Sequence, residues 1–410
     1  MTEDLWTFDA KMLGVTMELD RTRRELDSVA KYARSRYIGA SPGGGWRQFL
    51  DEGGQPTVTG TACVVQSLAL IHEGRRDYQM DGAGQYLVDV VQADGGWTKP
   101  ELEGRICLTL TTCLVLGALV SLGGHAQDAI AGGAAWLRRA QNPDGGWGNL
   151  PKDQLSDVTC TAYAIRTLTL VGQHHDGVQA SVGAAAEWIR RRRLPGGAWG
   201  SRTGRSGSLA HTSHAVEGLL AAGAEPSTLD ESREWLLREV TDRSNPWLEH
   251  YHYSEDYPSD LPVGSRLTWT HLPAERSLIA LLKLGVDPMD DIVHSLVADM
   301  RARHVDDTYW SVATVPDAAP SWAVLEATSG LILYRDRLEK SGQLSVVRAV
   351  IRELTDRLAD VTSTASAATD DLAALTDRVA MLERLIAESG ETNRRTRRLP
   401  GLLRQWEGRS

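Results

Sequence analysis

The sequence predicts an all-α protein in which six helical hairpins close into a double ring, an α6/α6 toroid, followed by a long coiled-coil helix. Two sets of landmarks that recur about every 50 residues predict the ring, because self-similarity at a fixed period is typical of repeat architectures. An uninterrupted heptad pattern after the last repeat predicts the coiled coil. With 13 Trp against 2 Phe, and 39 Gly, the composition favours the residues that form these landmarks.

The first landmark is a tryptophan that follows small or turn-forming residues, as in Gly95-Gly96-Trp97. Glycine takes the chain through conformations that are strained for other residues, and the indole ring offers a large area to bury between neighbouring units. The spacings are 51, 50, 52, 48 and 63 residues between Trp46, Trp97, Trp147, Trp199, Trp247 and Trp310.

The second landmark is a Thr or Ser that opens an apolar run, 11 to 23 residues after each tryptophan. We expect this residue to cap an inner helix. The apolar residues that follow are too continuous for a helix with only one buried side. The spacings are 50, 50, 51, 58 and 51 residues between Thr61, Thr111, Thr161, Thr212, Thr270 and Ser321.

Each unit therefore contains an outer helix, a turn and a more buried inner helix, and it cannot bury its apolar sides alone. Six units can close into a double ring or stack as an open solenoid. About 50 residues per unit is long for most solenoids of helical pairs, which favours the ring.

Gln92–Trp97 and Gln141–Gly148 resemble the QW repeats of the terpene cyclase/prenyltransferase superfamily. This superfamily includes squalene cyclases, class II diterpene cyclases and the β subunits of protein prenyltransferases. The resemblance covers about residues 23–335 and implies the toroid. It is much less specific for chemistry, because one fold can carry many functions.

We predict an N-terminal helix or arm at 1–22, the toroid at 23–335, a coiled coil at 336–390 and a basic, disordered tail at 391–410. Apolar and small residues from Val347 to Ile386 alternate steps of four and three, which indicates self-association or a partner protein at 344–388. The alternative is a helix folded back on the toroid. The basic, aromatic segment 394–406 could contact an anionic membrane.

The starts of the inner helices should converge on one rim and favour an anion, because free N–H groups and positive dipole ends gather there. The residue before each expected cap should line this rim: Gly60, Leu110, Cys160, His211, Trp269 and Pro320.

Class II cyclases resemble one another in an Asp-rich motif whose middle Asp protonates an alkene, which requires a strong, pre-organised acid. In this sequence Asp157 aligns with the first Asp of that motif, but Thr159 replaces the middle one and Cys160 the last. The resemblance therefore implies that the standard acid is absent.

Protein prenyltransferases carry a zinc site of Asp, Cys and His. His211 falls on the position of the family's His, whereas Thr159 and Thr161 replace the Asp and Cys. A zinc site of His211, His214 and Cys160 is an unfavoured alternative, and we predict no metal or other cofactor.

A long insertion before Thr270 concentrates protonatable and aromatic residues at the expected cavity mouth, where loops often carry function. Glu249 and Asp256 join His211 and Asp157 as candidate catalytic residues. The remaining candidate ligand-binding residues are Cys160, His214, His250, Tyr251, His252, Trp269, His271, Arg205 and Arg266.

The formal net charge of −10 argues against binding nucleic acid with the whole surface. Four cysteines in apolar runs, an acidic N-terminus without the order of a secretory signal, and no apolar run approaching about 18 residues predict a cytoplasmic protein.

Three functions stay open at this point. The toroid could bind an apolar, isoprenoid-like or anionic-headed ligand, or a peptide, without the family's catalysis. It could be an active cyclase or prenyltransferase with a non-standard acid or histidine. It could also be a structural adaptor with a filled cavity. The scarcity of Phe argues against a cavity lined for carbocations, which relies on aromatic rings.

Overall fold

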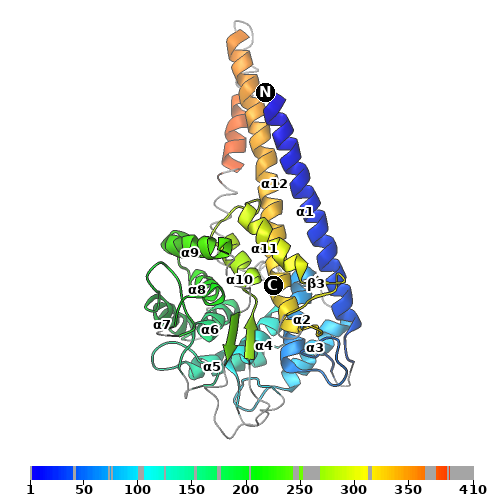
Figure 1. Cartoon of the computed structure of the whole chain (residues 1–410), viewed down its shortest axis with the longest axis vertical. Helices are drawn as coiled ribbons and strands as arrows, with labels where there is room; N and C mark the ends of the chain where they lie inside the picture. Colours follow the sequence, from blue (N-terminus) through cyan, green and yellow to red (C-terminus); the bar gives the residue numbers. More distant parts are fainter. Residues whose placement is uncertain are drawn as a thin grey trace. The chain divides into compact units, whose positions relative to one another are not determined.

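The computed structural model describes residues 2–39, 43–72, 74, 77–99, 106–123, 126–151, 155–172, 177–202, 205–242, 249–252, 268–312, 316–364, 375–385 and 387. The chain divides into two compact units. Thr22–Tyr334 form one unit, the toroid, and residues 1–21 with 335–410 form the other. In both units the described residues are predominantly helical (Figure 1).

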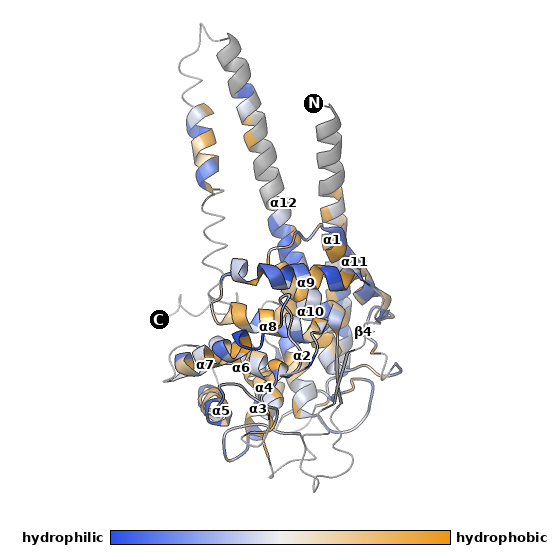
Figure 2. Ribbon diagram, turned by 60° about the vertical axis from the view of Figure 1, so that its left-hand side comes forward, coloured by the Kyte–Doolittle hydropathy of each residue, from blue (hydrophilic) through white to orange (hydrophobic). Residues whose placement is uncertain are grey.

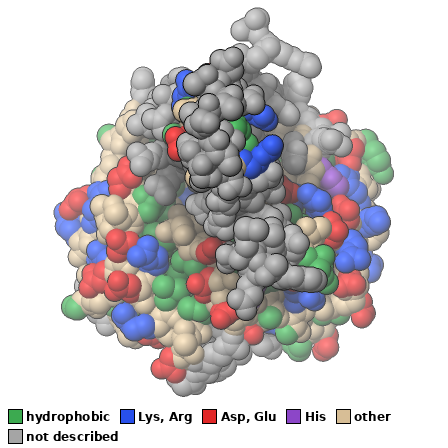
Figure 3. All heavy atoms as spheres, turned by 90° about the horizontal axis from the view of Figure 1, so that it is seen from above, with side chains coloured by type: hydrophobic (Ala, Val, Ile, Leu, Met, Phe, Trp, Pro, Cys, Tyr) green, Lys and Arg blue, Asp and Glu red, His purple; other side chains and the backbone are tan. Residues whose placement is uncertain are grey.

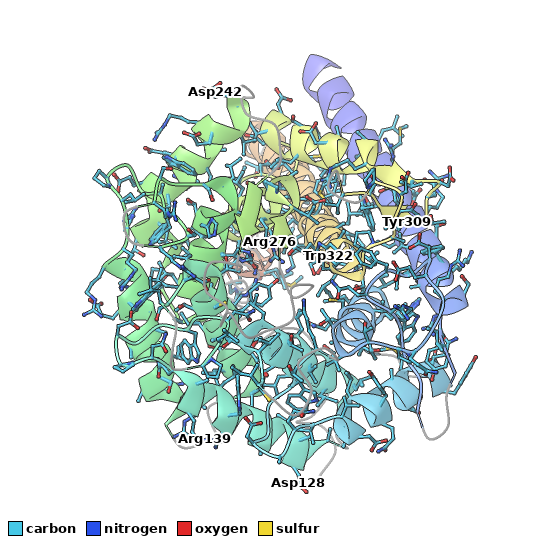
Figure 4. The ribbon with its side chains drawn as sticks, turned by 60° about the horizontal axis from the view of Figure 1, so that its bottom comes forward. Asp128, Arg139, Asp242, Arg276, Tyr309 and Trp322 are labelled. Carbon is cyan, nitrogen blue, oxygen red and sulfur yellow. The ribbon has the colours of Figure 1, made fainter. Side chains whose placement is uncertain are left out.

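Outer and inner helices alternate along the chain. The outer helices are α1 (Thr2–Ser35), α3 (Tyr78–Asp89), α5 (Gln127–Ala140), α7 (Val178–Arg190), α9 (Asp230–Thr241, after the short 3-10 helix Pro226–Leu229) and α11 (Asp291–Ala302). The inner helices are α2 (Val58–Ile71), α4 (Thr109–Leu122), α6 (Val158–Val171), α8 (Leu209–Ala221), α10 (Pro273–Lys283) and the first part of α12 (Ser321–Thr364). Figure 4 shows these elements following one another around a ring.

The inner helices are buried on nearly all sides, as their continuous apolar runs predict. In α4, every residue from Thr109 to Leu119 is buried. The outer helices bury one side only: α9 buries Ser232, Leu236 and Val240, and hydrophilic and hydrophobic residues alternate along it in Figure 2. On the face seen in Figure 3, the described basic and acidic side chains are interspersed.

The same backbone hydrogen bond joins successive repeats and closes the ring. The first residue of an inner helix donates its N–H to the carbonyl two residues after the tryptophan of the next repeat, as Val158 does to Ser201 (3.0 Å). Thr109 bonds to Asn149 in this way (2.9 Å), and Ser321, in the last repeat, bonds to Gln48 in the first (2.8 Å). Because the last repeat uses this bond with the first, the hairpins form a closed ring and the open solenoid is wrong.

The spacing between tryptophan and threonine recurs in the repeats for a different physical reason from the helix cap that we expected. The threonine is not the helix cap: α2 and α6 are capped by Thr57 and Asp157, four residues earlier. Instead, the threonine hydroxyl accepts a hydrogen bond from the tryptophan backbone N–H. The pairs are Trp46–Thr61 (3.0 Å), Trp97–Thr112 (3.0 Å), Trp147–Thr161 (2.9 Å) and Trp199–Thr212 (3.0 Å).

This geometry corrects two expectations. In the second repeat the bonded residue is Thr112, so the expected Thr111 was one position out of register. In the fifth repeat Thr270 lies in a strand before α10 rather than at a helix start. The expected rim residues are therefore not equivalent: Cys160 and His211 are three residues after their caps, whereas Trp269 precedes its helix altogether.

The tryptophan rings are wedged between neighbouring outer helices. Trp97 donates its indole N–H to the carbonyl of Leu87 in α3 (2.7 Å), and its ring leaves no room for a side chain at Gly133 in α5. The turn before it needs glycine for two reasons, which Gly145 and Gly146 illustrate. Gly145 has a φ of +94°, and a Cβ at Gly146 would lie 2.6 Å from that of Ser156.

The fourth repeat has Ala198 at the second glycine position. Its methyl group fits because Gly207 replaces the residue that Ser156 provides in the third repeat, and a Cβ at Gly207 would lie 2.6 Å from that of Ala198. The two substitutions therefore compensate each other, and the turn is preserved.

The expected boundaries at residues 22 and 335 both fall inside helices, because α1 covers Thr2–Ser35 and α12 covers Ser321–Thr364. A further helical stretch covers 375–385. Within these helices Leu354 and Leu382 of the heptad pattern are less exposed than Thr355 and Met381 beside them. The tail 391–410, including the basic segment 394–406, lies outside the described residues.

Two short antiparallel hairpins interrupt the helical pattern. One joins β1 (Glu249–His252) to β2 (Thr268–His271), and the other joins β3 (His304–Val305) to β4 (Tyr309–Trp310). None of the described helices is both long enough and apolar enough to cross a membrane.

Candidate functional site: a buried ion cluster on the inner helices

His211 lies in the first turn of α8 and is buried. Its Nδ1 is 2.7 Å from the hydroxyl of Ser208, which caps the same helix and also accepts the backbone N–H of His211. Burial lowers the pKa of His211 to about 4. The imidazole is therefore neutral at pH 7.

Asp157 caps α6, accepting the backbone N–H of Cys160 at 2.8 Å. Burial, together with the nearby Asp157, raises the pKa of the Cys160 thiol well above 9. The carboxylate that aligns with the family's first Asp thus has a structural partner, and the next two motif positions offer a hydroxyl and a neutral thiol.

The zinc alternative does not fit these residues. Within the part of the chain that the structure describes, no group of three or more His, Cys, Asp or Glu side chains could hold a metal ion. Cys160 would have to bind as a thiolate, which its burial opposes. The ring of His214 instead lies 5.4 Å from that of Tyr163 in α6.

The insertion before α10 forms the β1–β2 hairpin. Its register places Glu249 opposite His271 and Tyr251 opposite Trp269. His250 pairs with Thr270, and His252 with Thr268. Residues from the two ends of the insertion are thus brought together at the level of the backbone.

Arg205 is exposed on the loop before α8. Asp256 and Arg266 lie outside the described residues.

Sequence reasoning missed a buried ion cluster on four consecutive inner helices, α6, α8, α10 and α12. Its centre is the guanidinium of Arg276 in α10, which lies toward the middle of the ring (Figure 4). Nη2 of Arg276 is 2.7 Å from Oε1 of Glu326 in α12 and donates to the hydroxyl of Tyr163 in α6 at 3.0 Å. Nη1 donates to Oε1 of Glu217 in α8 at 3.2 Å. One side chain therefore bridges three other inner helices.

Glu217 is the second hub. Besides Arg276, its Oε2 accepts hydrogen bonds from Arg166 at 2.8 Å and from Lys283 at 2.7 Å. Burial alone would raise the pKa of Glu217, but these three cations hold it far below the usual range. The Glu217 side chain is only 2% exposed, against 21% for Arg166 and 36% for Lys283. The cluster thus reaches solvent through Arg166 and Lys283.

The two carboxyl groups of the cluster have opposite properties. Burial raises the pKa of Glu326, although Arg276 opposes the shift, whereas Glu217 is a firmly ionised carboxylate. Protonating an alkene needs a carboxylic acid that is both neutral and strongly acidic. Glu326 therefore holds its proton more readily than a free carboxyl group does, whereas Glu217 is ionised.

The other side of the ring differs in chemistry. Neither α2 nor α4 contains an Asp, Glu, Lys or Arg residue. Burial raises the pKa of both Cys63 in α2 and Cys113 in α4 to about 12, so both thiols are neutral. The two polar side chains of intermediate exposure both donate to backbone carbonyls, Gln66 to Leu114 at 2.9 Å and Ser121 to Gly117 at 2.8 Å. This sector is uncharged throughout.

A signal for the cluster was present in the sequence. Each run that forms α6, α8, α10 or α12 contains charged residues among apolar ones, as Arg166 does in AYAIRTLTL and Glu326 in SWAVLEATSG. A charge is almost never fully buried unless it is paired. Charges in four successive buried helices therefore predict that they meet.

Known proteins resemble part of this chain in sequence. The sequence model of the squalene-hopene cyclase N-terminal domain matches residues 80–181. A drimenyl diphosphate synthase from Streptantibioticus cattleyicolor is 30% identical over 183 residues, 43% of this chain and 33% of that protein. A squalene–hopene cyclase from Zymomonas mobilis is 27% identical over 221 residues, 45% of this chain and 32% of that protein.

A solved structure of a terpene cyclase has a similar fold. A variant of the type II terpene cyclase MstE from Scytonema, in complex with geranylgeranyl dihydroxybenzoate, superposes with a TM-score of 0.50 at 12% identity, covering 78% of this chain and 99% of that one. The chain is terpene cyclase-like in sequence and in fold. The matches span about a third of the length of the two curated relatives. This terpene cyclase-like fold supports isoprenoid-related binding or catalysis.

Proposed function

We propose that the toroid binds an amphiphilic, isoprenoid-like ligand between its inner helices and does not start the reaction of a class II cyclase. The observation that carries this proposal is the two-sided chemistry of the ring. The uncharged α2 and α4 suit an isoprenoid chain, because burying apolar surface is favourable wherever no polar group is left unpaired. The ion cluster of α6, α8, α10 and α12 suits a polar head.

The absence of an acid supports the part of the proposal that excludes cyclisation. At the position of the proton-donating aspartate stands Thr159, a hydroxyl group that cannot protonate an alkene. Glu326 and Glu217 fail for opposite reasons, one because it is a weakened acid and the other because it is ionised. The alternative, an active cyclase or prenyltransferase, would need Glu249 or Asp256 from the insertion as its acid.

For the rim we propose contact with the ligand rather than catalysis. His211, His214 and Cys160 line the N-terminal ends of α6 and α8, and the β1–β2 hairpin would add aromatic and histidine side chains. A neutral His211 can hydrogen-bond a carbonyl or hydroxyl group of a ligand. The structural adaptor stays the second candidate, because Arg276 bridges part of the ring with protein atoms.

Ligand extraction tests the binding proposal. The purified protein is analysed by native mass spectrometry and by extraction into organic solvent, and it is then titrated with geranylgeraniol and geranylgeranyl dihydroxybenzoate. We expect a co-purifying apolar molecule or saturable binding. A protein that binds neither compound and carries nothing would favour the adaptor. Cyclised products found by gas chromatography–mass spectrometry would contradict the exclusion of catalysis.

We also propose that residues 344–388 associate as a coiled coil, with another copy or with a partner protein. The observation behind it is the heptad pattern, in which apolar and small residues alternate steps of four and three from Val347 to Ile386. Deleting residues 344–410 should convert an oligomer to a monomer, measured by light scattering, without unfolding the toroid. The same number of subunits before and after the deletion would contradict self-association.

A further inference from the structure

The ion cluster carries more positive than negative charge. Three cations (Arg166, Arg276 and Lys283) surround two carboxyl groups (Glu217 and Glu326). The neighbouring Glu275 does not alter this sum, because it is paired with Arg303 at 2.6 Å. Tyr163 stays neutral, since burial raises its pKa. The excess is at least one positive charge.

The cluster also has unused hydrogen-bonding capacity. Nε of Arg276 is buried and has no hydrogen-bond partner among the described residues, although the side chain is only 6% exposed. Leaving a buried donor unpaired and a buried charge uncompensated is costly. A group that supplies both negative charge and acceptor atoms would compensate the excess charge and pair this donor. It would not serve the two carboxyl oxygens of Glu326, which also have no hydrogen-bond partner among the described residues.

The cluster extends from the middle of the inner helices to the carboxyl end of α10. Arg276 is the fourth residue of α10, and Glu326 lies in the first turns of α12. Arg166 and Glu217 lie in the second halves of α6 and α8, and Lys283 is the last residue of α10. Partial negative charge at the carboxyl end of a helix stabilises a cation there, so the end of α10 stabilises the charge of Lys283, the most exposed of the three cations.

We propose that Arg166, Arg276 and Lys283 bind the oxyanion of the ligand, a carboxylate or a diphosphate, on the charged sector of the inner ring. Guanidinium groups hold such oxygens through paired hydrogen bonds, and an ammonium group adds a point charge. Lys283 and Arg166, the two more exposed cations, would contact it first, and Arg276 would face it from inside. This inference rests on the proposed function, because it assigns the head of the same amphiphile.

The proposal gives the ligand a direction. The head would lie against α8 and α10, and the isoprenoid chain would extend along α2 and α4. An anion held at the N-terminal rim would instead depend on Arg205 or the β1–β2 hairpin and not on Lys283.

The test compares four compounds and two matched variants by isothermal titration calorimetry. The compounds are inorganic pyrophosphate, geranylgeranyl diphosphate, geranylgeraniol and inorganic sulfate. Lys283→Met removes one charge of the cluster but keeps the aliphatic stem. Lys31→Met does the same on an exposed part of α1. Should Lys283→Met fail to fold, Arg166→Gln removes a charge from the other side of Glu217.

We expect the natural protein to bind geranylgeranyl diphosphate at least tenfold more tightly than geranylgeraniol, and to bind pyrophosphate alone. Lys283→Met should weaken both anions at least fivefold and leave geranylgeraniol unchanged, whereas Lys31→Met should alter none of them. Sulfate should bind more weakly than pyrophosphate, because it carries fewer oxyanion groups.

Equal affinity for the diphosphate and the alcohol, or affinities that Lys283→Met and Arg166→Gln leave unchanged, would overturn the oxyanion site and leave the proposed function standing. Binding of pyrophosphate that depends on Lys283, without binding of either isoprenoid, would have the opposite meaning. It would retain the anion site and contradict the isoprenoid ligand.

Discussion

The two sectors of the inner ring have the same backbone and opposite chemistry. In the uncharged sector, α4 receives the bond from Trp97 through Thr112; in the charged sector, α6 receives it from Trp147 through Thr161. Yet α4 contains no Asp, Glu, Lys or Arg, whereas α6 contributes Arg166 to the ion cluster. The comparison teaches that the repeat landmarks fix the ring, while the side chains that face one another inside it are free to differ.

The substitution with the largest expected effect on stability disrupts the charged sector. Glu217→Gln leaves Arg166, Arg276 and Lys283 close together without their shared carboxylate. Removing one partner of a buried ion cluster typically costs about 3–5 kcal/mol, so we expect a loss of that size in the free energy of unfolding, measured in urea.

Glu187→Gln is the matched control, because Glu187 is exposed on α7 and its pair with Arg190 is long at 3.8 Å. This variant should change stability by less than about 0.5 kcal/mol. A Glu217→Gln variant as stable as the control would show that the cluster is not held by its charges.

The second prediction concerns pH and His211. The folded-state pKa of about 4 lies below the ordinary histidine value of 6.5, so the unfolded chain binds more protons between these values. Stability from this residue is therefore present above pH 6.5 and is lost as the pH falls toward 4, by about 2 kcal/mol between pH 7 and pH 5.

Because other groups titrate in the same range, the measured quantity is the difference from His211→Gln. The variant should lose about 2 kcal/mol less than the natural protein over this interval. Parallel pH profiles would mean that His211 is accessible to solvent when protonated, and the N-terminal rim would then be open.

The smallest effect sharpens the comparison itself. Thr112→Val and Thr161→Val each leave a buried tryptophan N–H without its acceptor, which should cost about 1–2 kcal/mol. If one scaffold underlies both sectors, the two losses should be equal in thermal unfolding. Thr111→Val, next to the bonded residue, should lower the thermal stability less than Thr112→Val does. A larger loss for Thr111→Val would mean that Thr111, as the sequence predicted, is the repeat landmark.

The sequence predicted the ring because its landmarks are local and repeated. Gly145 and Gly146 are needed within a single turn, and the tryptophan after them recurs at a fixed period, so each repeat supports the interpretation of the others. The predicted position of the threonine was wrong in LTLTTC. Thr111 and Thr112 are the same residue type there, and only the hydrogen bond from Trp97 distinguishes Thr112 from its neighbour.

The ion cluster could not be placed in the same way. Arg276 and Tyr163 are separated by 113 positions and come from helices with α8 between them. Their contact depends on how α6, α8 and α10 pack against one another, and no local pattern records it. The buried charges were visible in the sequence, but their partners depended on this packing.

Photolabelling tests the central claim, that the two sectors orient one amphiphilic ligand, most directly. A geranylgeranyl diphosphate analogue that carries a diazirine at the far end of its chain is bound, irradiated and mapped by peptide mass spectrometry. We expect labelled peptides from 58–71 or 109–122, the residues of α2 and α4. Labels confined to α8 and α10, or to the outer helices, would contradict the claim.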